Sequence, residues 1–389
     1  MRRLLLLALL FATLPAGAQV GEVGARVGAA LAIVAEAMDA GRDEDALARL
    51  EVLRQRRLNP AERALVERTR GYLLARQERF EAAIDALRAA LDTGALQGEA
   101  LQAVRLDLGQ LLLAQGRDGE GLALLEAWRA DGGRLSAPLV DWIAYAYYRN
   151  GRKAEAAALL DEALARFPPR RNWYELRAAL YQEAGEDARA VALLQQALDR
   201  FPGAGALWRR LAAAQLALER PEAALASLLI ADGQGLLGPE DRLHIARLFN
   251  QVGAPYHGAR LLQAVLDSGA LPPEADHWGL VGELLAQARE RRAALTAFAR
   301  AAEGAEDGRW DLRRGELLLE TGDWAGAEAA LARALERGVE AAARPRAAYL
   351  LGVALAQQGR TDEARDRFQT VREDPQLGPY ARRWLERLG

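Results

Sequence analysis

The chain has 389 residues, of which 51% are apolar and 27% are charged, a balance typical of a protein that buries a large core. Its 51 basic and 54 acidic residues give a net charge of −3, without the excess of Lys and Arg that a nucleic-acid surface requires. Cysteine is absent, which excludes disulfides, thiolate metal sites and cysteine nucleophiles. Because Lys and Arg are not in excess, we expect no nucleic-acid partner.

The N-terminus carries the pattern of a secretory signal. Two arginines precede the apolar run Leu4–Leu14, and Pro15 and small residues follow up to Ala18. Residues 1–18 are therefore predicted to be a signal peptide cleaved after Ala18. The eleven-residue run is too short to cross a bilayer, so no stable membrane insertion is expected after cleavage. An exported chain without cysteine fits a periplasmic location.

A period of about 34 residues organises the rest of the chain. The clearest unit is Trp173–Pro202, with a similar unit at Asp141–Pro168 before it and another from Leu207 after it. Each unit has an apolar pattern of helical period, a short polar turn and a second helical pattern. Neither strand alternation nor a β-hairpin motif occurs. The sequence therefore predicts a series of helical hairpins.

Small residues recur at one position in each of the two helices of every unit. In chain order, the second-helix sites are Ala46, Ala83, Gly121, Ala156, Ala190, Ala224, Gly258, Ala294, Ala327 and Ala364. The sites twelve residues earlier, on the first helix, are Val34, Gly71, Gly109, Ala144, Ala178, Ala212, Ala246, Gly282, Gly315 and Gly352. All but Val34 are Ala or Gly, as close packing of antiparallel helices requires. Ten hairpins are predicted, with extra loop residues at 131–136, 270–274 and 339–344.

Two further patterns accompany these sites. Glycines fall in the predicted turns, where a left-handed residue commonly ends a helix: Gly116, Gly151, Gly185, Gly253, Gly322 and Gly359. Large residues lie four positions after the second small site and are predicted to fill the space between successive hairpins: Leu160, Leu194, Leu228, Leu262, Phe298, Leu331 and Phe368. In the seventh unit Gly258 replaces Ala, so less regular packing is expected there.

These motifs resemble the tetratricopeptide repeat, and the match is clearest at Trp208, Leu211, Ala212, Ala224, Leu228 and Ala231. The resemblance implies an all-α fold, a helical-hairpin solenoid that forms a right-handed superhelix of about ten repeats. This solenoid would occupy residues 19–376. Residues 377–389, with Tyr380 and Trp384, are expected to form a capping helix over the exposed apolar end of the stack.

The residues that usually carry catalysis are not arranged for it. The three histidines, His244, His257 and His277, lie outside any HExxH or comparable ligand spacing. No serine lies in a G-x-S-x-G context, and the glycine-rich stretch 233–238 lacks the Lys-Ser/Thr end of a phosphate loop. We therefore predict a non-enzymatic protein with no catalytic residues, no cofactor and no metal site.

The resemblance implies a concave groove lined by the first helices of the hairpins. Its groove-facing positions lie 3 residues before and 1, 4 and 5 residues after the first small site. In repeats four to seven the predicted partner-binding residues are Asp141, Tyr145, Tyr148, Arg149, Glu175, Gln182, Arg209, Arg247, Asn250 and Gln251, with Glu183 beside them. Four other aromatic residues are expected to pack between hairpins, namely Trp142, Tyr147, Trp173 and Tyr181. Tyr and Arg are enriched in binding hot spots.

The middle repeats, including the stretches WIAYAYYRNG and LWRRLAAAQLAL, also resemble periplasmic repeat proteins found with TonB–ExbB–ExbD energy-transduction systems. This resemblance implies a scaffold that binds protein partners in the cell envelope and links the motor complex to outer-membrane uptake. Two alternatives remain open, a scaffold for exopolysaccharide export and a glycan-binding periplasmic protein. The repeat pattern does not choose among them, and it leaves the oligomeric state open.

Overall fold

The computed structural model describes residues 23–389, and every element of regular structure in that span is an α-helix. The all-α fold and the hairpin architecture predicted from the sequence are confirmed. The predicted signal peptide, residues 1–18, lies outside the described residues. The chain divides into two compact units, one ending at Leu180 and the other beginning at Tyr181.

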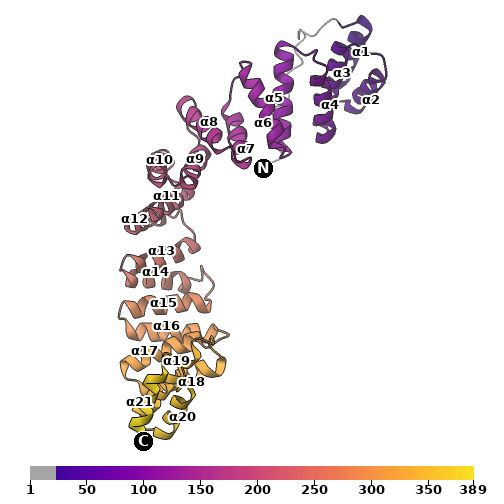
Figure 1. Cartoon of the computed structure of the whole chain (residues 1–389). Coiled ribbons are helices and arrows are strands. Elements are labelled where there is room, and N and C mark those ends of the chain that lie inside the picture. Colours follow the sequence, from indigo (N-terminus) through magenta and orange to yellow (C-terminus); the bar gives the residue numbers. More distant parts are fainter. Residues whose placement is uncertain (1–22) are drawn as a thin grey trace. The chain divides into compact units, whose positions relative to one another are not determined.

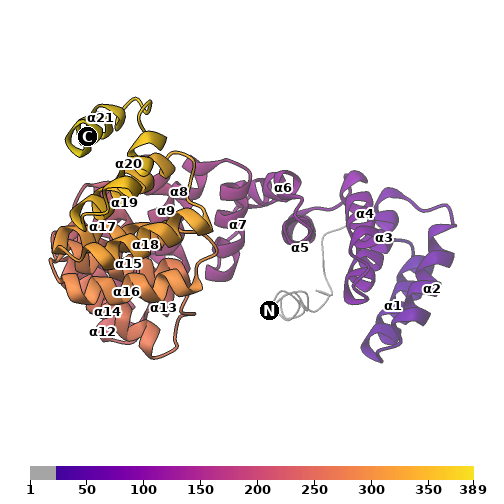
Figure 2. The same cartoon turned by 90° about the horizontal axis from the view of Figure 1, so that it is seen from below.

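The first unit contains four complete hairpins and the beginning of a fifth (Figure 1). Its helices are α1 (Ala25–Asp39), α2 (Asp43–Arg54), α3 (Pro60–Arg76), α4 (Phe80–Asp92), α5 (Gly98–Ala114), α6 (Asp118–Ala130), α7 (Ala137–Arg149) and α8 (Lys153–Arg166). Helix α9 (Arg171–Glu183) starts in this unit and ends in the next. Figure 2 shows α3 packed along α4 in a second view.

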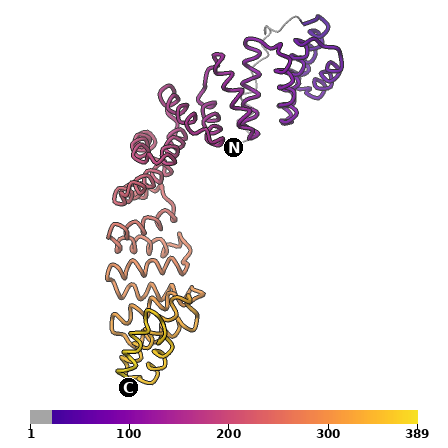
Figure 3. The backbone as a smooth tube through the Cα atoms, in the orientation of Figure 1, coloured from indigo at the N-terminus to yellow at the C-terminus, as the bar shows by residue number. Residues whose placement is uncertain are grey.

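The second unit continues the same alternation to the C-terminus. It contains α10 (Asp187–Arg200), α11 (Gly205–Ala217), α12 (Pro221–Gly233), α13 (Pro239–Gln251), α14 (Pro255–Asp267), α15 (Ala275–Gln287), α16 (Arg291–Gly304), α17 (Arg309–Thr321), α18 (Trp324–Arg337), α19 (Arg344–Gln357), α20 (Thr361–Thr370) and α21 (Gly378–Leu388). The backbone trace in Figure 3 follows α13 to α16 as successive antiparallel passes. The three predicted long loops coincide with inter-hairpin connections, except that Arg344 already belongs to α19.

The small sites lie where the two helices of a hairpin cross. A Cβ atom added to Gly121 in α6 would lie 2.8 Å from the carbonyl oxygen of Gly109 in α5. In the seventh hairpin a Cβ on Gly258 would lie 2.5 Å from the carbonyl oxygen of Ala246. Gly258 therefore lets α14 approach α13 more closely than alanine would.

Every hairpin turn between residues 23 and 389 has one residue in the left-handed conformation. Seven of these residues are glycines with φ between 70° and 77°, namely Gly41, Gly116, Gly151, Gly185, Gly253, Gly322 and Gly359. The other three turns hold Glu78, Glu219 and Arg289 at φ of 60°, 57° and 62°. A side chain costs about 1–2 kcal/mol in this conformation, so these three turns carry strain that the glycine turns avoid.

The large residues that follow the second small site contact two hairpins at once. A Cβ added to Gly282 in α15 would meet the ring of Phe298 at 2.5 Å, so this ring fills the space that the glycine leaves in its own hairpin. The same ring stacks on Trp310 of the next hairpin, with the ring centroids 6.1 Å apart. Leu331 contacts Gly315 in the equivalent way. These side chains therefore join each hairpin internally as well as to its neighbour.

Arginine–carboxylate pairs link equivalent helices of neighbouring hairpins. On second helices, Arg88 of α4 pairs with Glu120 of α6 and Arg129 of α6 pairs with Glu162 of α8. On first helices, the pairs are Arg209–Asp241 (3.1 Å), Arg313–Glu283 (3.7 Å) and Arg346–Glu316 (2.8 Å). We call these contacts the inter-repeat ion pairs. Most of their side chains are partly exposed, so each pair stabilises its interface by about 0–1 kcal/mol.

The last helix covers the end of the stack. Trp384 of α21 stacks on Phe368 of α20, with the ring centroids 5.5 Å apart and the planes 9° apart. Phe368 is fully buried as a result. Tyr380, on the same helix, is 54% exposed and takes no part in this contact. Trp384 is therefore the residue of α21 that closes the core at this end of the stack.

Candidate functional site

Three predicted groove residues gather at the C-terminal end of α7. The rings of Tyr145 and Tyr148 stack with their centroids 6.5 Å apart, and the guanidinium of Arg149 lies 5.0 Å from the Tyr145 ring centroid. Arg149 also forms an ion pair of 2.7 Å with Asp118 at the start of α6. Tyr145 is 51% exposed. We call Tyr145, Tyr148 and Arg149 the tyrosine–arginine cluster.

Asp141 lies one turn earlier on α7, where its carboxylate is occupied by contacts within its own unit. Its oxygens accept hydrogen bonds from Asn172 and from the indole nitrogen of Trp173. Arg170 forms an ion pair of 2.9 Å with the same carboxylate. Asp141 therefore ties α7 to the start of α9. A partner would have to displace these contacts to bind it.

Of the other predicted groove residues, Glu175 belongs to the first unit and the rest belong to the second. In the first, Glu175 forms an ion pair of 3.2 Å with Arg171 one turn before it. In the second, Arg209 pairs with Asp241, while Arg247 and Gln251 are exposed and Gln182 and Asn250 are half-buried. Arg149 and Arg209 are thus both paired with aspartates, so neither contributes an unpaired positive charge.

The four aromatic residues expected between hairpins are mostly buried. Trp173 is 1% exposed and Tyr147 is 8% exposed, and both belong to the core between α7 and α9. Burial raises the pKa of Tyr147 to about 12, and its hydroxyl donates a 2.8 Å hydrogen bond to Glu126. Trp142 packs at the edge of this core. Tyr181 is half-buried, and the guanidinium of Arg189 lies 4.5 Å from its ring centroid.

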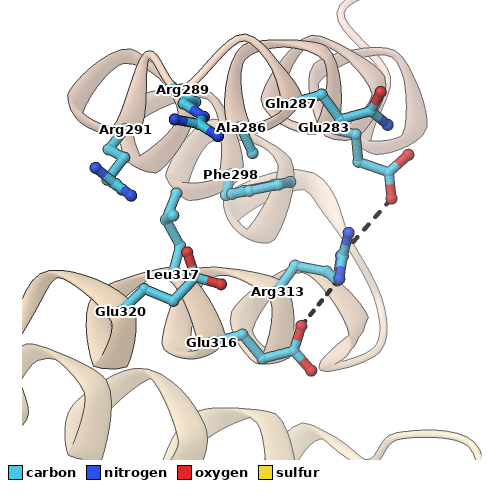
Figure 4. Close-up of a pocket in the computed structure, with 10 residues that line it drawn as sticks. All are labelled: Glu283, Ala286, Gln287, Arg289, Arg291, Phe298, Arg313, Glu316, Leu317 and Glu320. Carbon is cyan, nitrogen blue, oxygen red and sulfur yellow. Dashed lines mark hydrogen bonds and ion pairs between the residues drawn. The ribbon is translucent and has the colours of Figure 1, made fainter.

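A pocket of about 310 Å³ lies between α15, α16 and α17 of the second unit. Figure 4 shows Phe298 near its centre, with Arg289 and Arg291 toward one end and Glu283 and Arg313 toward the other. The remaining lining residues are Ala286, Gln287, Glu316, Leu317 and Glu320. Arg313 bridges Glu283 at 3.7 Å and Glu316 at 2.9 Å, so the charges at that end satisfy one another.

This pocket was missed by the sequence analysis, although a signal for it is present. Glu283, Ala286 and Gln287 lie 1, 4 and 5 residues after the first small site Gly282, which are the groove-facing positions. Glu316 and Glu320 have the corresponding positions after Gly315. Applying the positional rule to repeats eight and nine would have found them. Arg289 lies in the turn and Arg291 lies in the second helix, whereas the groove-facing positions all belong to first helices.

A buried polar cluster lies between α3 and α5 in the first unit. Burial raises the pKa of Asp107 to about 6, against the opposing effects of a hydrogen bond to Tyr72 and the nearby charge of Arg68. Burial and the neighbouring Asp107 also raise the pKa of the Tyr72 hydroxyl. Arg68 is 5% exposed. An ionised carboxylate at Asp107 therefore destabilises the folded unit, because desolvation outweighs its partners.

Residues 23–389 contain neither a metal-ligating cluster nor a membrane-spanning helix. In that span, no group of three or more His, Asp and Glu side chains is arranged to hold a metal ion. No helix there combines the length and apolar character needed to cross a bilayer. His277 donates a 2.9 Å hydrogen bond from Nδ1 to the carbonyl oxygen of Pro272, and His257 packs against Phe249 and Tyr256.

Comparisons with solved structures give helical repeat proteins. A tetratricopeptide repeat protein from Parabacteroides merdae has 16% identity and a TM-score of 0.40, covering 66% of this chain and all of that one. MamA AMB-1 has 23% identity and a TM-score of 0.38, covering 44% of this chain and 91% of that one. The anaphase-promoting complex hetero-tetramer Cut9–Hcn1 has 11% identity and a TM-score of 0.33, covering 93% of this chain and 83% of that one. These scores are too low to carry an argument about function.

Comparison with models of protein families identifies the type of repeat. No curated protein sequence matches the chain. Two models of the family described as tetratricopeptide repeat match it, one at residues 68–134 and 312–378 and the other at residues 141–169 and 175–204. The matched segments fall on consecutive hairpins in both units. The chain is therefore a tetratricopeptide-repeat protein, a helical scaffold of the kind that mediates protein–protein interaction.

Proposed function

We propose that this protein is an exported scaffold of the cell envelope that binds a protein partner through its first helices. We further propose that the partner belongs to a TonB–ExbB–ExbD energy-transducing complex, which the scaffold links to outer-membrane uptake. The signal-like N-terminus supports export, and the resemblance of the middle repeats to periplasmic TonB-associated proteins supports the assignment of the partner.

The tyrosine–arginine cluster is the observation that carries the proposed binding role. Tyr145 presents half of its surface to solvent although it stacks on Tyr148 and beneath Arg149. Stacking fixes the ring, so little side-chain entropy would be lost when a partner covers it. A tyrosine ring offers apolar area with a polar tip, and arginine offers a planar set of donors for carbonyl or carboxylate oxygens. These are the properties of a binding hot spot.

Export is tested by sequencing the N-terminus of protein extracted from the envelope. Cleavage after Ala18 predicts a mature chain that begins at Gln19 or within a residue or two of it. An intact N-terminus retained in the membrane fraction would refute export of a processed chain.

Partner binding is tested with the double variant Tyr148→Ala and Arg149→Ala, after far-UV circular dichroism has shown unchanged helicity. Tyr380→Ala is the control, because this tyrosine is as exposed as Tyr145 of the cluster but lies on the capping helix. The double variant should lose co-purification with TonB, ExbB or ExbD from envelope extracts, while the control should keep it. If both variants retain the complex, the cluster is not the binding site.

The stacked pair Tyr145–Tyr148 also favours a second candidate, because exposed aromatic rings bind sugar faces in glycan sites. Under that alternative the protein would serve exopolysaccharide export or bind glycans in the periplasm. Oligosaccharide binding that the double variant loses, with protein co-purification unchanged, would select this candidate over the TonB-linked role.

A further inference from the structure

The two ends of the pocket between α15, α16 and α17 differ in charge. At one end, Glu283, Arg313 and Glu316 pair with one another, and Arg346 also pairs with Glu316. At the other end, the guanidinium groups of Arg289 and Arg291 form no hydrogen bond or ion pair with any residue between 23 and 389. Glu320 is the acidic residue drawn toward this end in Figure 4. Two arginines against one glutamate leave that end with a net positive charge.

The backbone at Arg289 gives independent support for a role of this side chain. Arg289 occupies the left-handed turn position, at φ 62°, that glycine fills in seven of the ten hairpins between residues 23 and 389. Glycine would remove the strain without disturbing a buried contact, because Arg289 is exposed. A strained residue whose side chain lines a pocket is a common feature of ligand sites. Arg289 therefore keeps a side chain at the pocket in a turn where glycine would avoid the backbone strain.

We propose that this pocket binds an acidic side chain from an extended segment of a protein partner. The carboxylate would lie between the guanidinium groups of Arg289 and Arg291, which suit bidentate recognition of carboxylates. The aliphatic stem of the acidic side chain would contact Leu317 and Phe298. The amide group of Gln287 would form a hydrogen bond with the backbone of the segment.

This inference rests on the proposed function, since it assumes that first helices bind protein segments. It adds a site in repeats eight and nine, remote in sequence from the tyrosine–arginine cluster, and it names the ligand chemistry. The protein itself carries a net charge of −3, so unspecific attraction cannot account for binding of an acidic peptide.

The probes are hexaglutamate, hexaglutamine and hexalysine peptides, each acetylated, amidated and labelled with a neutral fluorophore. Anisotropy titrations of the full chain in low salt should show that hexaglutamate binds and that the other two do not. Blocking the C-terminus separates recognition of a side chain from capture of a terminal carboxylate. Hexaglutamine binding as tightly, hexalysine binding more tightly, or no binding of hexaglutamate would each overturn the proposal.

Three variants test the assignment of residues. Arg289→Gly should weaken hexaglutamate binding by about tenfold while leaving the thermal midpoint unchanged or higher, a combination that a structural role would not produce. Glu320→Gln should strengthen binding by about threefold, because it removes the opposing charge. Glu219→Gly is the control, since it relieves the same turn strain in a hairpin without this pocket. Unchanged affinity in both Arg289→Gly and Glu320→Gln would refute the site. Failure of these titrations leaves the proposed function standing, because co-purification with the Tyr148 and Arg149 variant tests it separately.

Discussion

Replacing Gly258 by alanine should destabilise the protein, although alanine is the better helix former. In the middle of a helix this change alone gains about 1 kcal/mol. At Gly258, however, the new Cβ would lie 2.5 Å from the carbonyl oxygen of Ala246, which is backbone and cannot rotate away. A carbon–oxygen contact needs about 3.3 Å, so α13 and α14 must separate by about 0.8 Å.

Such overpacking costs about 1–3 kcal/mol, and a contact with backbone belongs at the upper end of that range. The net expectation for Gly258→Ala is a loss of about 1–2 kcal/mol. Gly28→Ala is the matched control, because a Cβ at this helical glycine would meet no heavy atom within 4 Å. It should stabilise the protein by up to about 1 kcal/mol.

Guanidinium denaturation followed by far-UV circular dichroism measures both effects. Since repeat arrays respond to damage locally, amide hydrogen exchange should also show faster exchange in α13 and α14 of Gly258→Ala. The reasoning is refuted if Gly258→Ala is as stable as the parent and protection in these helices is unchanged.

Three other predictions concern single contacts. Asp107→Asn should stabilise the protein at pH 7.5 by up to about 3 kcal/mol. Because the pKa of this carboxyl is raised to about 6 in the folded state, the carboxyl favours folding below about pH 4 and loses that contribution as the pH rises through 6. Urea midpoints should therefore fall with pH in the parent and not in the variant. Asp161→Asn should cost about 1 kcal/mol in thermal or urea unfolding, because buried Arg177 donates to both carboxylate oxygens at 2.8 and 2.9 Å. Trp384→Ala should cost about 2 kcal/mol and speed hydrogen exchange in α19 and α20 while leaving the first unit unchanged, because it uncovers Phe368. Uniform protection loss over the whole chain would contradict this local role.

The sequence predicts the hairpins well because one geometric requirement repeats. Antiparallel helices that cross closely need small residues at the crossing, and this requirement leaves a mark in every unit that composition alone would not produce. Turn glycines follow from a similarly local rule. Glu219 and Arg289 do not follow that rule, because a glutamate or an arginine in the sequence does not indicate a left-handed backbone. Their conformation is imposed by the two helices that they connect.

Contacts of groove residues are harder to predict, because they depend on side chains that come from other helices. Position along α7 places Tyr145, Tyr148 and Arg149 on a shared surface, as the helical period requires. The same period cannot show that Asp141 is occupied by Arg170 and Trp173, which follow a non-helical connection. Pairing partners of this kind decide which groove charges remain available to a ligand.

The inter-repeat ion pairs have a consequence for how unfolding spreads along the chain. Each pair couples one hairpin to the next, whereas the small-residue crossings hold a hairpin together internally. Salt screens partly exposed charge pairs but leaves apolar packing largely intact. Raising the ionic strength should therefore weaken the coupling between neighbours more than the hairpins themselves. The cooperativity length, the number of hairpins that melt together, would then shorten with salt, so that one broad transition at high ionic strength replaces a sharper one at low ionic strength.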